Sequence, residues 1–374
     1  MKHFFYLLAV FALCACGHTH TQINDTATPD STLTVSYAKG FVVDYFDNYK
    51  RVTLYDPWRD GQILATYYLV QSDSVNVPET GTKIIIPLQH IAVTSCTHFE
   101  FLRLIGVLNT ITGVCSPELI YNDSLRTAYA EGRIVSLGDA FNTNTERLLM
   151  LRPDALMLAS YNQQDNNAKR LQSVGIPLLF NNEWTERSLL ARAEWIKFVA
   201  AFYNKEQETC ALFSEIEHRY NAAKILAATA NHQLTVMAGG NFKGTWYVPG
   251  GQSYMGQLFA DAGADYFYKN DTTTGSLPLN FETVLHNFSQ ADVWLNAPVA
   301  TMKELFAMDE RHELFSAAKN HYVYGFYART HVGGANDFWE SAVAHPDIVL
   351  TDIIWALHPE LLPEYQPVYL LKLQ

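Results

Sequence analysis

The chain has 374 residues and a mass of 42.3 kDa, a length that corresponds to two domains at roughly 100–200 residues each. Hydrophobic residues make up 48% of it and charged residues 17%, a balance that excludes an intrinsically disordered chain. The 26 basic and 38 acidic residues give a net charge of −12. This excess of acid argues against nucleic-acid binding, because basic patches supply the affinity for phosphate backbones.

The first sixteen residues have the features of an export signal. Lys2 and His3 precede an apolar stretch from Phe4 to Leu13, which small residues follow, an order typical of a secretory signal peptide. The segment Leu13-Cys14-Ala15-Cys16 resembles the lipobox of bacterial lipoproteins. That resemblance implies that Cys16 is the acylated first residue of the mature chain, and several acyl chains would anchor it stably to a membrane. The alternative is an ordinary signal peptide that contains two cysteines.

Residues 17–33 are rich in Thr, Asp, Asn and Ser, a composition that predicts a solvated, flexible tether. His18 and His20 lie in this segment, and we assign them to the tether rather than to a metal site. Beyond the first twenty positions the sequence contains no apolar run of about 18 residues, so no bilayer-spanning segment is expected there.

Three cysteines follow the predicted signal: Cys96, Cys115 and Cys210. An odd count leaves at least one of them unpaired, even in an exported protein. Cys96 and Cys115 each follow a strand-like run, so they would lie at the same sheet end if the two strands are parallel neighbours. A disulfide between them and two separate free thiols both remain open. Cys210 lies on the apolar side of a predicted helix, which favours a buried thiol.

Residues 34–87 are predicted to be β-rich, because β-branched and aromatic residues gather in runs separated by turn residues. From His90 onward, strands and helices alternate. Strands are predicted over His90–Ser95, Thr110–Val114, Ala155–Ala159 and Pro177–Phe180, with helices over His98–Ile105, Thr143–Leu151 and Asn166–Val174. This alternation predicts βαβ units and a parallel sheet. Polar residues follow each strand, and ligands bind open α/β sheets at the carboxyl ends of the strands, so this edge is the candidate site.

A second region of alternating strands and helices follows a long helix, which is predicted over residues 205–230 and preceded by another over Leu189–Tyr203. In the long helix, apolar residues from Cys210 to Ala227 recur at spacings of three and four, which indicates one buried stripe. The sequence therefore predicts an α/β protein with two Rossmann-like lobes joined by one long helix and a ligand cleft between the lobes. The expected organisation is a signal peptide over 1–16, a tether over 17–33, an N-terminal lobe with a β-rich extension over 34–204, the linking helix over 205–230 and a C-terminal lobe over 231–374.

This arrangement resembles the helix-hinged, class III periplasmic substrate-binding proteins of ABC importers, which carry ferric siderophores, cobalamin or haem. Several segments are similar to a Bacteroidetes lipoprotein branch of that family: Arg192–Phe198, Trp246–Gly251, Asp261–Ala264, Asn336–Glu340 and His358-Pro359-Glu360. The resemblance runs from about Gly40 to the end of the chain. It implies a monomeric, lipid-anchored, non-enzymatic binding protein on the periplasmic side of a bacterial membrane. Its partners would be the permease subunits and a small metal chelate, and it would hold no cofactor or metal ion of its own.

In this family one acidic residue on each lobe typically meets a basic pocket on the permease. Glu146 and Glu282 match that pattern, each in the first turn of a predicted helix. The alternative is that glutamate near a helix N-terminus is favoured by the helix dipole alone, by about 0.3–1 kcal/mol. The resemblance favours the permease role for both residues.

Aromatic and polar residues after the strands are the expected lining of the ligand cleft, since ligand pockets are mostly apolar with a few orienting polar groups. They are Cys96, Thr97, Cys115, Tyr161 and Trp184 in the first lobe, and Asn241, Trp246, Tyr247, Asn296, Tyr327 and Arg329 in the second. Arg329 is expected to pair with an anionic ferric chelate. A ferric siderophore is therefore the first choice of ligand, a corrinoid the second and haem the third, with packing in the core or rim as the alternative role of each residue.

The sequence also allows two other functions to be tested against its residues: direct metal capture and hydrolysis. Direct metal capture would use His98 or His331, which are expected near the predicted cleft, but the thirteen histidines are scattered. An exported hydrolase would need a Gly-x-Ser-x-Gly elbow after a strand, and Gly251-Gln252-Ser253-Tyr254-Met255-Gly256 has one residue too many. Neither alternative is favoured by the sequence.

Overall fold

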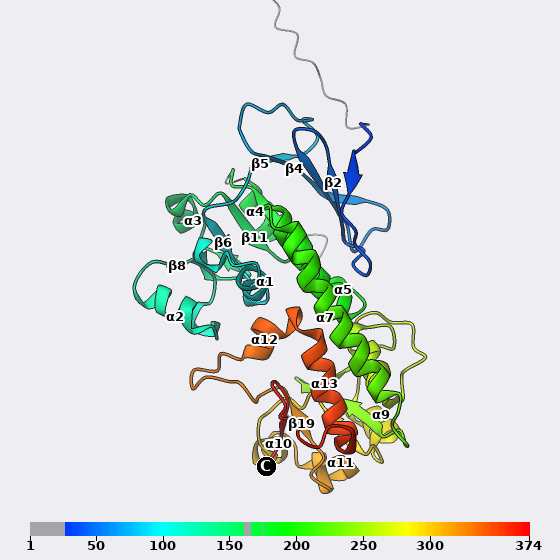
Figure 1. Ribbon diagram of the computed structural model, residues 1–374. Coiled ribbons are helices and arrows are strands. Elements are labelled where there is room, and N and C mark those ends of the chain that lie inside the picture. Colours follow the sequence, from blue (N-terminus) through cyan, green and yellow to red (C-terminus); the bar gives the residue numbers. More distant parts are fainter. Residues whose placement is uncertain (1–26, 161–165, 174) are drawn as a thin grey trace, which may run out of the picture.

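Helix α7 (Glu206–Ala227) joins two lobes in the computed structural model, which describes residues 27–160, 166–173 and 175–374 (Figure 1). Its 22 residues span about 33 Å at a rise of 1.5 Å each. Phe213, Ile216, Tyr220 and Ala227 form its buried side, as the apolar spacing predicts. Cys210, expected as a buried thiol on the same stripe, is only partly buried. Helix α13 (Pro346–Leu357) of the C-terminal lobe packs along it.

The N-terminal lobe is built on a parallel five-stranded sheet. Its strands lie in the order β12 (Leu178–Phe180), β11 (Ala155–Leu158), β6 (Ile91–Val93), β7 (Ile111–Val114) and β8 (Val135–Ser136). The order reverses around β6, which places a topological switch point there, where open α/β sheets bind their ligands. The helices of this lobe are α1 (Phe99–Leu104), α2 (Asp123–Ala130), α3 (Thr145–Leu151) and α4 (Asn166–Gln172).

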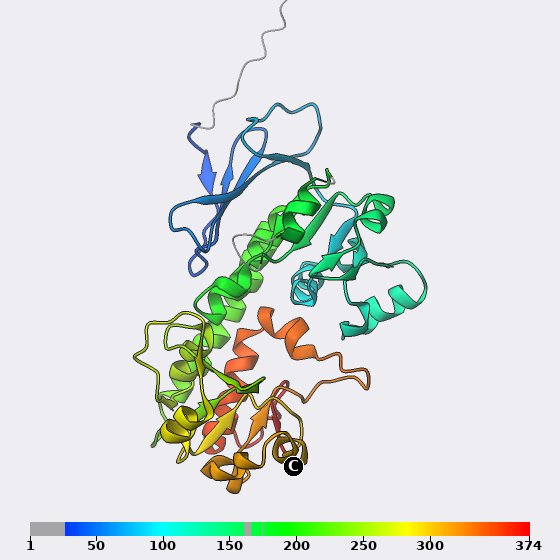
Figure 2. The ribbon, with the colours of Figure 1, turned by 180° about the vertical axis from the view of Figure 1, so that it is seen from behind.

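The predicted β-rich extension forms a separate five-stranded sheet at the end of the molecule away from the C-terminal lobe (Figure 2). It comprises β1 (Ser31–Thr32), β2 (Phe41–Tyr45), β3 (Lys50–Tyr55), β4 (Ile63–Val70) and β5 (Thr82–Ile85), antiparallel except for the β4–β5 pair. Phe41 packs edge-on against Trp195 and Phe198. These two aromatic residues belong to a region predicted as one helix, which the structure divides at Trp195 into α5 (Leu189–Glu194) and α6 (Ile196–Ala201).

The C-terminal lobe has a smaller parallel sheet in the order β16 (Asp265–Tyr266), β13 (Thr235–Ala238), β18 (Val293–Leu295). A three-stranded antiparallel sheet of β14 (Gly240–Phe242), β15 (Thr245–Pro249) and β17 (Ser276–Leu279) lies beside it, and β19 (Tyr324–Gly325) pairs with β20 (Leu371–Lys372). Besides α13, the helices of the C-terminal lobe are α8 (Tyr254–Asp261), α9 (Phe281–Phe288), α10 (Met302–Met308), α11 (Ser316–Lys319) and α12 (Asp337–Ser341). The predicted α/β class with two lobes joined by one helix is confirmed.

Two short antiparallel strands, β9 (Gly138–Asp139) and β10 (Asn142–Thr143), complete the secondary structure together with several single turns of 3₁₀ helix. Among the described residues, none of the helices combines the length and the apolar character that crossing a membrane requires.

Candidate ligand site between the lobes

The segment around helix α12 of the C-terminal lobe reaches the N-terminal lobe and makes direct contacts with it (Figure 1). The carboxylate of Glu340 accepts hydrogen bonds from the backbone N–H groups of Tyr121 at 2.6 Å and Asn122 at 3.0 Å. Asn122 is also the N-cap of α2, where its side chain accepts a hydrogen bond from the N–H of Leu125. The C-terminal lobe thus binds the start of a helix in the N-terminal lobe through a buried carboxylate.

Tyr121 is the centre of a second set of contacts between the lobes. The ring of His331 stacks on it with 4.5 Å between centroids, and His331 Nε2 lies 3.0 Å from the carbonyl oxygen of Tyr121. The guanidinium of Arg329 lies 5.5 Å from the centroid of the Tyr121 ring, within the range of a cation–π interaction. Arg329 also pairs with Asp337, with 3.0 Å between Nε and Oδ2.

A third contact joins Glu100 of α1 to His345, which precedes α13, with 2.5 Å between Oε1 and Nε2. Arg103 donates two further hydrogen bonds to the same carboxylate, each 2.6 Å long. Burial alone would raise the pKa of Glu100, but the hydrogen bonds from Arg103 and His345 outweigh it and lower the pKa. Glu100 is therefore an anion held between one cation of its own lobe and a histidine of the other.

These residues enclose a cavity of about 400 Å³ that both lobes line. Its charged lining is made of four carboxylates, two arginines and one histidine: Glu100, Asp123, Asp337, Glu340, Arg103, Arg329 and His345. Burial raises the pKa of Asp337, and it raises that of Glu340 to about 7 against the lowering effect of the Tyr121 and Asn122 N–H groups. Each of the three buried carboxylates has a partner, whereas the guanidinium of Arg329 is about half exposed. It remains accessible to an anionic ligand.

Several of the residues predicted to line the cleft lie at the carboxyl ends of strands. Thr97 lies in the first turn after β6 and lines a small interlobe pocket with Tyr254 and Trp339. The Sγ of Cys96 lies 3.8 Å from the carbonyl oxygen of Trp339. Trp184 and Tyr247 are exposed. Tyr327 follows β19, and its hydroxyl donates a hydrogen bond of 2.7 Å to the carbonyl oxygen of Pro298. Arg329 is the predicted residue that lines the cavity described above.

The structure corrects two of the expected site residues. Trp246 is fully buried in the core of the C-terminal lobe against Trp294 and Phe315. It therefore offers no surface to a ligand, because its strand β15 alternates sides and turns this residue inward. Cys115 is also buried, with its Sγ 3.8 Å from the hydroxyl of Thr143.

The remaining predicted residues either make contacts within their own loop or belong to the part of the chain that the structure does not describe. Cys96 and Cys115 are free thiols, so the disulfide left open by the sequence is not formed. The Asn241 side chain accepts a hydrogen bond from the N–H of Gly244 within the β14–β15 turn. Asn296 takes a left-handed conformation with φ of 53° directly after β18. Tyr161 and Cys16 lie outside the described residues.

Sequence reasoning missed the residues that join the lobes, above all Tyr121, Glu340 and His345. Glu340 belongs to the Asn336–Glu340 segment that resembles the lipoprotein branch, but that resemblance assigns it no role. The sequence did hold one signal: Asp337 and Glu340 stand beside aromatic residues in one short segment. Charged side chains are rarely buried without a partner, so acids in an apolar segment indicate a contact with another part of the chain.

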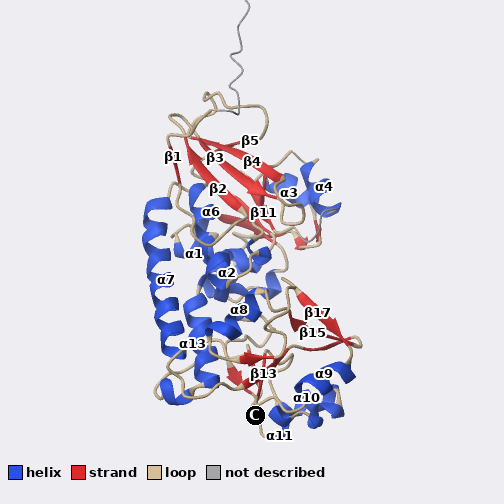
Figure 3. Cartoon of the chain, turned by 90° about the vertical axis from the view of Figure 1, so that its right-hand side faces the viewer, coloured by secondary structure: helices blue, strands red, loops and turns tan. Residues whose placement is uncertain are grey.

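The two expected permease-contact residues share one local structure. Glu146 is the second residue of α3, whose N-cap Asn144 accepts a hydrogen bond from the N–H of Arg147. Glu282 is the second residue of α9, whose N-cap Asn280 accepts one from the N–H of Thr283. Both glutamates are exposed. Figure 3 shows α3 and α9 on the side of the molecule away from α7, one on each lobe.

Comparison with known proteins decides the family. Residues 91–330 match the family described as periplasmic binding protein. The chain belongs to this family. An uncharacterised lipoprotein of Methanocaldococcus jannaschii is 27% identical over 352 residues, which cover 88% of this chain and 83% of the relative.

Solved structures share the fold at low sequence identity. A periplasmic haem-binding protein of Pseudomonas aeruginosa superimposes with a TM-score of 0.57 at 16% identity, covering 77% of this chain and 98% of that one. A possible iron-binding periplasmic solute-binding protein of Staphylococcus epidermidis gives 0.56 at 16% identity, covering 72% and 99%. These matches show that the two-lobed, helix-linked fold is the class III one.

Family membership fixes the general role of this binding protein. It is an extracytoplasmic, non-enzymatic component of an ABC importer that presents a small ligand to a permease. The cleft between its lobes is therefore the place where a ligand is expected.

Proposed function

We propose that this binding protein captures a ferric siderophore between its lobes and delivers it to the membrane permease of an ABC importer. The observation that carries the proposal is the cavity that both lobes line, with Arg329 between the ring of Tyr121 and the carboxylate of Asp337. Ferric siderophores are bulky and often anionic chelates, and a half-exposed guanidinium beside an aromatic ring offers them both charge and a stacking surface.

Haem and corrinoids are the alternative ligands for the same cleft. The similarity to a haem-binding protein of Pseudomonas aeruginosa favours haem as an alternative, and both ligands need aromatic surface of the kind that Tyr247 and Trp184 expose. Haem iron would require an axial ligand. His345 lines the cavity but bonds Glu100, and the nearby His331 contacts Tyr121. Either ring would have to leave its contact to bind haem iron.

We further propose that Cys16 carries the lipid anchor and that residues 17–33 connect it to the folded lobes on the periplasmic side of a bacterial membrane. The uncharacterised lipoprotein that matches 88% of this chain supports this assignment. The Bacteroidetes lineage, the monomeric state and the ligand-cleft roles of Cys96, Thr97, Trp184, Tyr247, Tyr327 and Arg329 remain predictions.

The decisive experiment is to purify the protein from its native host and to record its absorption spectrum and intact mass under non-denaturing conditions. A ferric siderophore would give a broad charge-transfer band and a mass that includes one iron, whereas haem would give a Soret band and a corrinoid the cobalt-corrin bands. Titration of the ligand-free protein with the identified compound should then show saturable binding that Arg329→Ala weakens at least tenfold. Recovery of haem or a corrinoid would replace the siderophore by that alternative, and recovery of a ligand that contains neither iron nor cobalt would contradict all three.

A further inference from the structure

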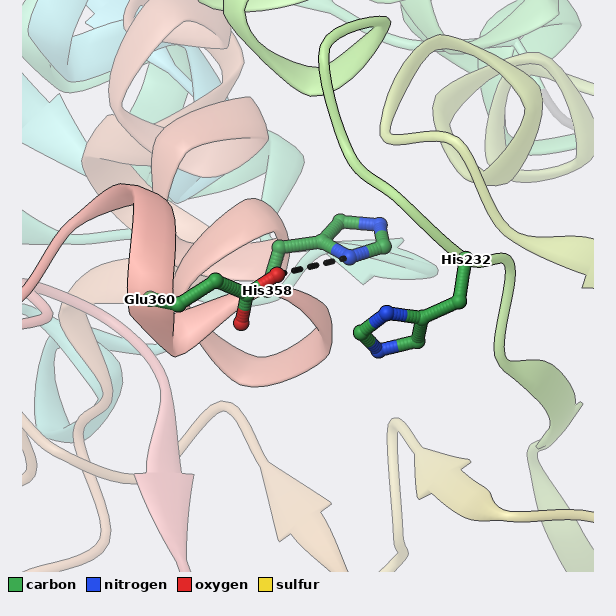
Figure 4. Close-up of side chains that lie close together, drawn as sticks. All are labelled: His232, His358 and Glu360. Atoms are coloured by element: carbon green, nitrogen blue, oxygen red, sulfur yellow. Dashed lines mark ion pairs between the residues drawn. The ribbon is translucent and has the colours of Figure 1, made fainter.

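Three potential metal ligands meet in the C-terminal lobe, away from the cleft. His232 follows α7 in the connection to β13, His358 directly follows α13, and Glu360 lies in the turn after it (Figure 4). One ligand atom from each residue lies within 4.8 Å of the other two. Helix α13 begins beside the interlobe contacts and runs for 12 residues, so this cluster lies about 18 Å further along the lobe.

His358 is the buried member of the cluster, and its ring lacks a well-formed hydrogen bond. The residue is fully buried, and neither Nδ1 nor Nε2 makes a hydrogen bond of full geometry to a described residue, although the backbone of Ala262 lies close enough to the ring to act on it. Nε2 faces the backbone at Gly263, where an added Cβ would come within 3.4 Å of it. Nδ1 faces Glu360, with 3.9 Å to Oε1. Because buried polar side-chain atoms nearly always have partners, this imidazole lacks an interaction that a bound cation would supply.

The other two residues are able to close around such a cation. The His232 ring lies 5.7 Å from that of His358 at an angle of 70°. His232 is exposed and the Glu360 side chain is about half exposed, so both can shift without disturbing a packed core. Ligand atoms in a tetrahedral zinc site lie about 3.3 Å apart, as bond lengths of about 2.0–2.1 Å require. A small movement of these two side chains is sufficient.

The chemistry of the three groups selects the cation. Two imidazoles and one carboxylate suit zinc and its neighbours, whereas calcium and magnesium prefer all-oxygen shells. Three protein ligands leave a fourth position for water.

We propose that His232, His358 and Glu360 bind one divalent transition-metal ion of the zinc class, which ties the chain after α7 to the C-terminal end of α13. The ion is a resident of the C-terminal lobe and is separate from any metal chelate carried in the cleft. Since α7 links the lobes and α13 packs along it, the ion would stabilise the part of the C-terminal lobe on which the linking helix ends.

The test measures zinc binding to the full chain by competition with a chromophoric chelator. The background carries H18A and H20A, because the predicted tether offers a His-x-His pair of its own. We expect one Zn²⁺ per chain, at least tenfold weaker binding in His232→Ala and Glu360→Gln, and unchanged binding in the matched controls His218→Ala and Glu364→Gln. The control residues are exposed and belong to α7 and to the segment after Glu360.

Two further measurements distinguish a built site from weak surface binding. Co²⁺ added in place of Zn²⁺ should give the visible absorption bands of a four-coordinate ion, and these should be absent in His232→Ala. Zn²⁺ should raise the melting temperature of the parent protein but not that of His232→Ala, as expected for a ligand that binds only the folded state. Equal Zn²⁺ affinity in the parent protein and His232→Ala would overturn the proposal, and so would the absence of the Co²⁺ bands in the parent. His232 and Glu360 are exposed or half exposed, so neither variant is expected to fail to fold.

Discussion

Glu340 of the C-terminal lobe accepts a 2.6 Å hydrogen bond from the backbone N–H of Tyr121 in the N-terminal lobe. The carboxylate is almost fully buried, and it lies in the same cavity as Asp337, Glu100, Arg329 and His345. Because this contact between the lobes depends on one buried acid, its strength is expected to depend on whether that acid is charged.

The contribution of Glu340 to stability is expected to depend on pH. Burial raises its pKa to about 7, so the folded state binds a proton more tightly than the unfolded chain does, where the pKa is about 4.3. The contribution is therefore fully present below about pH 4.3 and is lost as the pH rises through about 7. The upper limit of this effect is about 4 kcal/mol.

Glu340→Gln isolates this effect, because glutamine stays neutral and the other titratable groups of the cavity are present in both proteins. Urea unfolding at pH 5 and pH 8 should show that the wild type loses stability relative to Glu340→Gln as the pH rises. A difference between the two proteins that is the same at both pH values would contradict the assignment.

Charge reversal at the two exposed helix starts should separate transport from binding. If Glu146 and Glu282 contact the permease, the double variant Glu146→Lys/Glu282→Lys should abolish ligand uptake by cells while the purified protein keeps its affinity within about twofold. The control is Glu215→Lys/Glu364→Lys, which makes the same change of charge at two other exposed positions. Lost affinity in the purified variant, or normal uptake, would contradict the permease role.

Glu194 fixes the start of the β-rich extension and is expected to be a large single contributor to stability. Its carboxylate accepts hydrogen bonds from the backbone N–H groups of residues 36, 37 and 38 at 2.7–2.9 Å and pairs with Lys197 at 2.7 Å. Both side chains of the pair are buried. Glu194→Ala would leave the buried Lys197 ammonium without its charged partner and with only the carbonyl oxygen of Thr34, at 2.9 Å, so we expect a loss of about 3–5 kcal/mol in the free energy of unfolding.

Urea unfolding of Glu194→Ala and of Glu208→Ala provides the comparison. Glu208 pairs with Lys205 at the same 2.7 Å, but both side chains are at least one-third exposed. Exposed pairs of this kind contribute less than about 1 kcal/mol. Similar losses in the two variants would show that burial does not set the strength of the Glu194 interactions.

Local patterns were sufficient to predict the architecture. The alternation of strands and helices marks the two lobes, and the predicted apolar stripe from Cys210 to Ala227 marks α7, because its spacing is that of one helix side. The stripe is buried from Phe213 onward, while Cys210 is only partly buried. The division of the region after Leu189 at Trp195 was not predictable in this way, since both halves are helical and apolar.

The candidate site could be predicted only in part, because it depends on how the lobes meet. Thr97 and Arg329 follow strands, and strand ends were the signal used. Tyr121 and Glu340 lie far apart in the sequence and meet only when α12 reaches the N-terminal lobe. No local pattern encodes that contact, so tertiary structure was needed to find it.

The neighbours Trp246 and Tyr247 show the same limit and provide the last prediction. Both were expected in the cleft, but successive residues of a strand point to opposite sides. Trp246 is fully buried while Tyr247 is 46% exposed. Trp246→Ala should therefore cost about 3–5 kcal/mol of unfolding free energy, whereas Tyr247→Ala should change it by about 0.5 kcal/mol or less.

If Tyr247 lines the cleft, ligand titration should show the reverse order, with weaker binding in Tyr247→Ala and near-normal binding in the folded fraction of Trp246→Ala. Normal ligand affinity in Tyr247→Ala would remove this tyrosine from the site and leave Arg329 and Tyr121 as the residues to vary next.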